Sequence, residues 1–415
     1  MLMRDARMRY ASVRKLTEDL AKPLSDADAT IQSMPDASPA KWHLAHMSWF
    51  FETFILRDHV PGYQPYRADW PFLFNSYYET EGPRLGRAAR GMLSRPSLAD
   101  ILDYRSAVDA AMDRAIEQLS PEALALVELG CQHEQQHQEL LLTDILHAFS
   151  LNPLECAVWP RQGSPCPGDP APVIWLDGPQ GMIEIGARAT GSGTFAFDCE
   201  GPRHTALLHP HQLADRKVTN AEWLAFMADG GYEEPRLWLS DGWAWRQTQG
   251  VRAPFYWMDG AHGWTSFTLS GRHPIDPAAP VCHVSFYEAD AFATWAAARL
   301  PTEAEWEVAA AQHDPSGGNL LDGPGDIRPR PVHDSPRFFG DAWEWTGSAY
   351  RPYPGFSAAD GAIGEYNGKF MSGQYVLRGG SCATPRGHMR ASYRNFFYPH
   401  HRWQFMGLRL ARDGA

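Results

Sequence analysis

The sequence predicts two structural domains, the first all-helical and the second of mixed α+β type. Its 415 residues exceed the length of a typical single domain. Up to about residue 150, apolar residues recur at helical spacing; after a proline-rich segment, short strand-like runs alternate with many glycines and tryptophans. We therefore expect a four-helix bundle over residues 1–150, a linker over 151–180 and an α+β domain over 181–415.

Four stretches of the first domain have apolar residues at helical spacing, with capping residues or prolines near their ends. They are Tyr10–Leu24, Ser38–Asp58, Ser97–Leu119 and Pro121–Phe149. In the second stretch, Ser38 fits the N-cap and Pro39 the first turn. A long crossover, Val60–Pro96, separates the second stretch from the third, and bundles of this kind commonly hold a metal between facing helices.

The second domain follows a segment in which prolines predict little regular structure. One helix is expected over Ser285–Ala298. Another is expected to begin after Thr302, which fits an N-cap, with Glu305 completing a capping box.

Charge and cysteine content exclude several classes of protein. The net charge of −12 argues against nucleic acid or an anionic membrane surface as the main partner. The six cysteines include no CxxC pair, which is typical of reduced thiols in the cytoplasm. No apolar stretch has the pattern of a signal peptide or the length of a membrane span. We expect a cytoplasmic protein that is a monomer or a small homo-oligomer.

The segment His133–Glu139 is the most informative motif of the first domain. No glycine or proline interrupts it, and its flanks are apolar, so we place it within the fourth predicted helix. His133 and His137 then lie one turn apart on one face, with Gln136 beside them, and suit a first-row transition metal. The alternative interpretation is an exposed polar helix face that carries two histidines by chance. Leu140, Leu141 and Asp144 continue the same face, which indicates that it turns inward, where a metal explains the buried imidazoles better.

A third ligand would complete the site. His46 is the best candidate, on the apolar-faced second helix, but His43 lies close by and spacing alone barely separates the two. Each also fits a core histidine bonded to a backbone carbonyl. Three neutral imidazoles leave open positions on iron for substrate and oxygen, and the same ligands would also serve a zinc hydrolase.

The crossover carries candidate catalytic and binding side chains. Tyr77 and Tyr78 can donate a proton or a hydrogen bond near a metal, although two aromatic anchors for a loop explain them as well. Arg84, Arg87 and Arg90 can form bidentate pairs with a carboxylate, although such runs are usually solvated surface.

Three motifs stand out in the second domain: Trp343–Thr346, Arg378–Cys382 and Arg394–Phe397. Their aromatic side chains can cage a quaternary ammonium group, and the glycines suit turns with positive φ. The simpler interpretation is that most of these residues form the core and turns of an irregular fold.

Taken together, the motifs resemble those of a known family, the EgtB-type sulfoxide synthases of ergothioneine biosynthesis. The motifs similar to that family's DinB-like iron domain are Trp42–His46, Trp49–Glu52 and His133–His137. The motifs that resemble its second domain, a formylglycine-generating-enzyme type domain with a C-type-lectin-like fold, are Pro280–Glu307, Gly340–Thr346, Leu377–Ser381 and Gly407–Arg409. The resemblance covers nearly the whole chain in the family's domain order.

The resemblance implies a mononuclear non-haem iron(II) held by three histidines, which by position are His46, His133 and His137. The family uses O2 to join the sulfur of a cysteine-type thiol to the imidazole C2 of hercynine (trimethylhistidine), and it makes a sulfoxide. Thiolate and hercynine both bind iron there.

The resemblance also implies a hercynine site. Gln136 matches a glutamine near the hercynine ring. Asn395 and Phe396 match the pair that receives the carboxylate and the trimethylammonium end of hercynine.

Branches of the family differ in their thiol donor. The actinobacterial branch, which uses γ-glutamylcysteine, has an aspartate for the donor's amino group where this chain has Phe397. Of that branch's Tyr-x-x-Tyr segment, only Tyr366 is present here. Tyr77 and Tyr78 are instead similar to the branch that uses free cysteine, so the resemblance favours cysteine. The three crossover arginines could still clamp a γ-glutamyl carboxylate.

A phenol is expected to direct the reaction. Metal coordination lowers the pKa of a thiol, and oxygen would then readily oxidise the sulfur alone to a sulfinate. We hypothesise that Tyr77 or Tyr78 protonates the oxygen intermediate and diverts it towards C–S bond formation.

Three other functions fit parts of the sequence. A selenoneine synthase has the same architecture and joins a selenium donor to hercynine. A formylglycine-generating oxidase needs a closely spaced copper-binding cysteine pair near the C-terminus, where only Cys382 stands. A non-catalytic binding module would keep the histidines as a relic.

Overall fold

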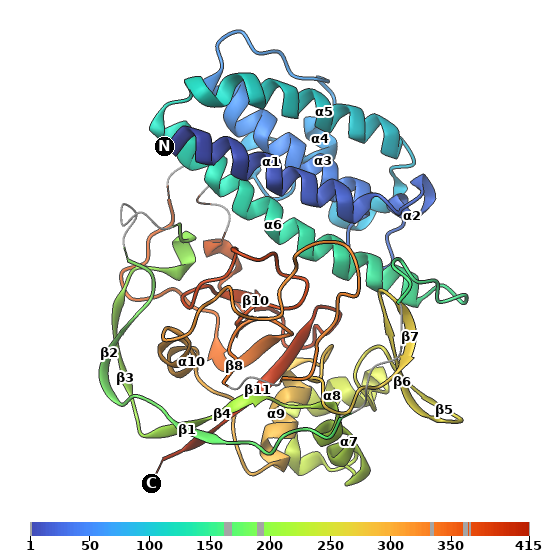
Figure 1. Cartoon of the computed structure of the whole chain (residues 1–415), viewed down its shortest axis with the longest axis vertical. Helices are drawn as coiled ribbons and strands as arrows, with labels where there is room; N and C mark the ends of the chain where they lie inside the picture. The colour runs from blue at the N-terminus through green and yellow to red at the C-terminus, as the bar shows by residue number, and fades with distance from the viewer. Residues whose placement is uncertain are drawn as a thin grey trace. The chain divides into compact units, whose positions relative to one another are not determined.

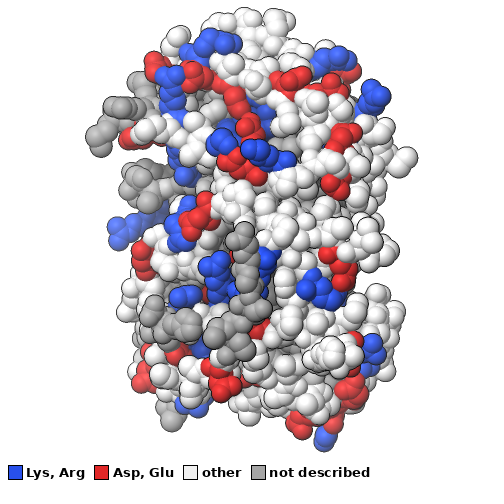
Figure 2. Space-filling view, turned by 45° about the vertical axis from the view of Figure 1, so that its right-hand side comes forward, with Lys and Arg blue, Asp and Glu red and all other residues white. Residues whose placement is uncertain are grey.

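The computed structural model describes residues 2–161, 168–188, 195–332, 336–359, 364 and 367–414. The chain forms two compact units, one of Met1–Val158 and one that contains Trp159–Ala359 and Asn367–Ala415 (Figure 1). None of the helices that the structure describes is both long and apolar enough to cross a membrane. Lys and Arg side chains are interspersed with Asp and Glu on the face that Figure 2 shows, so that face presents mixed charge.

The first unit is built on four long helices: α1 (Leu2–Ala21), α3 (Ala40–Phe51), α5 (Leu98–Ala115) and α6 (Pro121–Ser150). α1 packs against α6, α6 against α3 and α3 against α5, so the four form one bundle (Figure 1). α3 continues as a π-helix, η1 (Glu52–Arg57). The shorter elements are α2 (Asp26–Thr30), α4 (Pro71–Phe74), η2 (Glu79–Glu81), η3 (Arg87–Met92) and η4 (Ile116–Gln118).

The helix ends confirm most of the predicted boundaries and correct two of them. α6 begins at Pro121 as predicted. α1 begins before the predicted Tyr10, because the residues ahead of it are mostly good helix formers. The predicted cap of α3 is wrong, since its N-cap is Pro39, which offers no side-chain acceptor. Ser38 instead makes tertiary contacts, which sequence pattern does not reveal.

A buried ion cluster joins α1, α5 and α6. The fully buried carboxylate of Glu134 accepts hydrogen bonds from Arg14 Nη1 (3.1 Å), Arg105 Nη2 (2.8 Å) and Thr17 Oγ1 (2.6 Å). Burial raises the pKa of Glu134, but the two guanidiniums lower it more, to about 2, so the carboxylate is ionised. Because Glu134 follows His133 on α6, the cluster fixes how α6 is rotated about its axis.

The second unit contains three sheets. The largest has the strand order β1-β4-β11-β8-β9-β10, in which β11 and β8 are parallel and the other neighbours antiparallel. Its strands are β1 (Trp175–Asp177), β4 (His211–Lys217), β8 (Trp343–Ala349), β9 (Tyr375–Arg378), β10 (Asn395–Phe397) and β11 (Met406–Asp413). The smaller antiparallel sheets are β2 (Gly181–Ile185) with β3 (His204–Leu208), and β5 (Trp257–Gly260) with β6 (Gly263–Thr268) and β7 (Gly271–Pro274).

The helices of the second unit are α7 (Asn220–Ala228), α8 (Ser240–Gln249), α9 (Phe286–Trp295) and α10 (Glu303–Ala310), with short turns η5 (Asp198–Glu200), η6 (Pro235–Leu237) and η8 (Gly368–Phe370). Thr302 caps α10 and Glu305 completes the capping box, which confirms that prediction. β1 lies inside the segment 151–180 that was expected to be a linker, and it pairs with β4, so this part of the segment belongs to the sheet.

The tryptophan and glycine motifs of the second unit have structural roles. The buried carboxylate of Glu344 binds Lys217 Nζ, Arg409 Nε and Trp306 Nε1, each at 2.8 Å. Gly379 has φ +96°, and a Cβ there would lie 2.7 Å from the carbonyl oxygen of Phe338. These contacts confirm the interpretation of the motifs as core and turn elements.

We predict that Glu134→Gln lowers the free energy of unfolding of the first unit by about 3–5 kcal/mol, because two buried guanidiniums then face a neutral amide. The measurement is urea denaturation followed by the helical circular dichroism signal of the metal-free protein. Asp113→Asn is the control: Asp113 pairs with Arg7 at the surface, and its loss should change stability far less. Equal effects of the two substitutions would contradict the role given to the ion cluster.

Candidate metal centre

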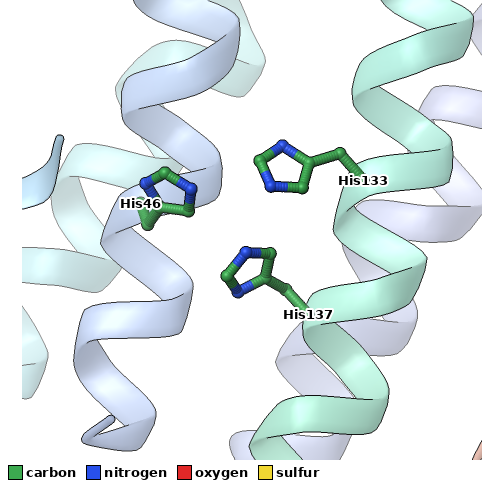
Figure 3. A group of neighbouring side chains, drawn as sticks. All are labelled: His46, His133 and His137. Atoms are coloured by element: carbon green, nitrogen blue, oxygen red, sulfur yellow. The ribbon is translucent and has the colours of Figure 1, made fainter. Parts of the chain in front are cut away.

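Three buried histidines converge inside the bundle of the first unit. His46 comes from α3, and His133 and His137 come from α6, with the three rings turned towards one another (Figure 3). One ring nitrogen of each lies within 4.8 Å of the others. Nitrogens bound to one ion at about 2.1 Å lie no more than about 4.2 Å apart, so a pair of ring nitrogens 4.8 Å apart would have to approach by at least about 0.6 Å on binding. The group could hold a metal ion.

His46 is oriented by its surroundings. Its Nδ1–H donates to the carbonyl oxygen of Phe74 (2.6 Å), and its buried Nε2 has no hydrogen-bond partner among the described residues. Trp42 and Trp49 both stack against the ring, with centroids 4.6 and 5.5 Å away. The tautomer and the ring plane are therefore set, and Nε2 is left to bind a metal.

All three imidazoles are neutral. Burial lowers the pKa of His133 to about 3 and lowers the pKa of His46 and His137 well below the usual value. The neighbouring imidazoles lower the pKa of His46 and His137 further. A neutral imidazole keeps one lone pair for a metal, so burial favours coordination over protonation.

His43 is not part of this group. Its Nδ1 lies 2.8 Å from Nδ1 of His137, and its Nε2 lies 3.1 Å from Oδ2 of Asp144. Sequence spacing alone could not choose between His43 and His46 as the third ligand, and the structure places His46 in the group. Asp144 was expected on the same face of α6 as His137, two helical turns on, but its contact with His43 on α3 joins residues 101 apart in the chain and leaves no local sequence signal.

Glu134 cannot serve as the general base that a zinc hydrolase would need. In the HExxH pattern that glutamate acts on a metal-bound water. Here the carboxylate is held by Arg14, Arg105 and Thr17, on α1 and α5. The site therefore favours chemistry that needs no adjacent carboxylate base.

The two crossover tyrosines lie next to the aromatic residues around the histidines. Tyr78 is buried, and its ring centroid is 5.6 Å from that of Trp49, which stacks on His46. Tyr77 is half-buried and packs against Tyr78 at 6.1 Å. The side-chain amide of Asn75 donates to the carbonyl oxygen of Tyr78 (3.1 Å) and holds the turn.

The three crossover arginines have different surroundings. Arg84 pairs with Glu79 (2.5 Å), and Arg87 is exposed. Arg90 is buried: its Nη1 donates to Ser38 Oγ (2.8 Å), and its guanidinium lies 3.3 Å from the ring centroid of Trp42. Burial lowers the pKa of Arg90 to about 9, which leaves it a cation at neutral pH.

The remaining predicted site residues are on α6, on β10 or outside the described residues. Gln136 is half-buried on α6, between His133 and His137. Asn395, Phe396 and Phe397 form β10 in the second unit. Tyr366 lies outside the described residues.

Two family models match the chain. Residues 9–141 match the DinB superfamily, and residues 175–322 and 332–414 match the sulfatase-modifying factor enzyme 1-like domain. The predicted fold class is thereby confirmed: a helical DinB-like region precedes an α+β domain of the formylglycine-generating-enzyme type.

Curated relatives match over the same span. The hercynine oxygenase of Mycobacterium tuberculosis is 34% identical over 414 residues, which cover 94% of each chain. That of Mycolicibacterium smegmatis is 36% identical over 420 residues, again 94% of each chain. The formylglycine-generating enzyme of Streptomyces coelicolor is 32% identical over 161 residues, which cover 32% of this chain and 45% of that enzyme.

We predict that the metal-free protein binds one Co(II) per chain and that His46→Ala or His133→Ala weakens binding by more than about 100-fold, the upper range for loss of an outer partner of a ligand. Equilibrium dialysis with metal analysis measures this. His59→Ala is the control, because His59 is an exposed histidine of the same unit. A parent protein without stoichiometric metal would instead fit the non-catalytic binding module.

Proposed function

The chain belongs to the hercynine oxygenase family of ergothioneine biosynthesis and is an oxidoreductase, and from this premise we propose that it joins hercynine to free cysteine in an iron(II)- and O2-dependent reaction that yields a sulfoxide. The observation that carries the proposal is the group of three buried, neutral imidazoles on the DinB-like bundle. The similarity to hercynine oxygenases over 94% of the chain supplies the reaction class.

Iron(II) suits the donor set. Three neutral nitrogen ligands, without a carboxylate, leave positions on the ion for small molecules. When bound by His46, His133 and His137, iron(II) would supply oxygen activation and hold the donor sulfur as a thiolate. Trp42 and Trp49 keep His46 in one plane and replace water around it with apolar surface.

Hercynine carries a carboxylate, a trimethylammonium group and an imidazole, and this chain offers a partner for each. Gln136 lies between two of the histidines and can hydrogen-bond the hercynine ring. Phe396 stacks on Tyr350 (4.1 Å), which gives an aromatic surface suited to a quaternary ammonium group. Asn395 accepts the backbone N–H of Phe396 with its Oδ1, and its side-chain NH2 group can donate to a carboxylate.

The thiol donor is proposed to be cysteine. Phe397 packs against Trp403 (5.7 Å), so this position offers an apolar ring where γ-glutamylcysteine would need an acid for its amino group. The pair Tyr77–Tyr78 supports the same donor through the resemblance to the cysteine-using branch. Arg84, Arg87 and Arg90 remain candidates for the donor's carboxylate, with Arg90 committed to Ser38 and Trp42.

Tyr77 or Tyr78 is proposed to hold the proton that directs the reaction. A phenol within reach of the reacting oxygen can protonate it and favour C–S bond formation over oxidation of the sulfur alone. Tyr78 packs against Trp49, which stacks on His46. Tyr77 packs beside Tyr78, and its side chain is half-exposed.

We predict that the iron(II)-reconstituted protein uses cysteine with a higher kcat/KM than γ-glutamylcysteine and that Phe397→Asp shifts the ratio towards γ-glutamylcysteine by about 10–100-fold, since a charged hydrogen bond is worth about 1.5–3 kcal/mol. Mass spectrometry identifies the products of parallel reactions with hercynine and each donor, a selenosugar included. Tyr398→Asp, at the exposed neighbouring position, is the matched control. Preferred conversion of the selenosugar would identify a selenoneine synthase instead.

We predict that Tyr77→Phe or Tyr78→Phe raises the ratio of cysteine sulfinate to sulfoxide by at least about 10-fold, because loss of a proton donor costs about 10²–10⁴ in the assisted step. Product ratios are measured under single-turnover conditions in oxygen-saturated buffer. Tyr66→Phe, an exposed tyrosine of the same crossover, should leave the ratio unchanged. Unchanged partitioning in both test variants rejects the assignment.

A further inference from the structure

We propose that Asp144 and His43 position His137 through a directed chain of hydrogen bonds that makes its Nδ1 a donor and leaves its Nε2 as the metal ligand. The inference rests on the proposed function, since it assumes that His46, His133 and His137 hold a metal. His43 and Asp144 are positioning residues in it and touch neither metal nor substrate.

The chain of contacts is short and fully buried. Nδ1 of His43 lies 2.8 Å from Nδ1 of His137, and Nε2 of His43 lies 3.1 Å from Oδ2 of Asp144. His43 and Asp144 are 3% and 6% exposed, so water competes little for either hydrogen bond. The contacts join α3 to α6, the same two helices that carry the three histidine ligands.

The direction of the chain follows from what each group can donate. An ionised carboxylate only accepts, so the hydrogen between Asp144 and His43 belongs to Nε2 of His43. A neutral His43 protonated at Nε2 has a bare Nδ1, which can only accept. The hydrogen between the two rings therefore belongs to Nδ1 of His137, and the lone pair of His137 is left at Nε2, which is free to bind a metal.

The opposite protonation would be incompatible with a metal at that nitrogen. A doubly protonated His43 would donate from Nδ1, and His137 would have to accept at its own Nδ1. A neutral His137 would then carry its hydrogen on Nε2, the atom that faces the other two histidines. The Nδ1–Nδ1 contact thus requires the Nδ1–H tautomer of His137 for coordination through its Nε2.

Asp144 is itself held in place from α3. Its Oδ2 accepts the backbone N–H of Ser38 (2.8 Å), immediately before the N-terminus of α3, where a negative charge is favoured. The hydroxyl of Ser38 accepts from Arg90, which lies over Trp42, and Trp42 stacks on His46. The outer supports of His137 and His46 are therefore parts of one continuous set of contacts.

Metal affinity tests the proposal in the full-length protein. The probe is Co(II) added to metal-free protein, with dissociation constants from chelator competition and with the ligand-field absorption bands of the bound ion recorded. His43→Phe removes the acceptor of His137 and should weaken Co(II) binding by about 10–100-fold and shift the bands. His43→Gln, which keeps an acceptor oxygen, should recover most of the affinity.

Two further variants separate the hydrogen-bond role from a structural one. Asp144→Asn, which replaces the carboxylate by a neutral amide, should fall between the parent and His43→Phe in affinity. His283→Gln is the control, because His283 is a buried histidine of the second unit; it should bind Co(II) like the parent. Equal loss in His43→Phe and His43→Gln, or a loss of similar size in His283→Gln, would overturn the proposal.

A measurement on the parent protein avoids any dependence on variants that fold poorly. Zn(II)-loaded protein with ¹⁵N-labelled histidine should show His43 as the neutral Nε2–H tautomer and His137 protonated at Nδ1. A doubly protonated His43, or one protonated at Nδ1, would overturn the relay while leaving the metal site intact. Failure of the parent to bind Co(II), or unaltered binding by His46→Ala, would instead remove the proposed function on which the relay rests.

Discussion

The metal centre depends on how α6 is rotated, and a buried charge decides that rotation. Glu134 lies between Arg14 and Arg105 with no exposure to water, and its neighbour in sequence, His133, lies about 100° further round the helix. A carboxylate buried without these cations would cost several kcal/mol, so rotations that separate them are strongly disfavoured. The ionic side of α6 thus imposes the direction of its imidazole side, and the centre needs no contact of its own to orient the helix.

The residues around the three histidines keep the imidazoles oriented and neutral, which favours metal binding. Trp42 and Trp49 stack on His46, and the apolar shell keeps the imidazoles neutral. Three neutral imidazoles that converge in a buried site suit coordination of a cation. Arg90 is a buried cation whose guanidinium lies 3.3 Å from the ring centroid of Trp42, and Trp42 also stacks on His46.

Sequence predicted the residues that carry the chemistry better than the residues that support them. The histidine spacing in α6 and the start of that helix at Pro121 are local patterns, and the structure shows both. Ser38 was expected to cap α3, yet its N–H and hydroxyl are used by Asp144 and Arg90. A cap is a local preference of about 1 kcal/mol, which tertiary hydrogen bonds to charged groups can exceed. Partners that are far apart in the chain leave no periodic pattern in the sequence. These supporting hydrogen bonds are therefore evident only in the folded structure.

The choice of thiol donor is a property of a few side chains and not of overall identity. The curated hercynine oxygenases that match this chain at 34–36% identity define its reaction class, but two thirds of the aligned positions differ from them. Discriminating one donor from another by tenfold takes about 1.4 kcal/mol, which a single charged contact supplies. An apolar ring at Phe397, packed against Trp403, removes one such contact for a donor that carries an additional ammonium group. The proposed preference for cysteine therefore depends on this ring of the second unit, whereas the proposed metal chemistry depends on the histidines of the first.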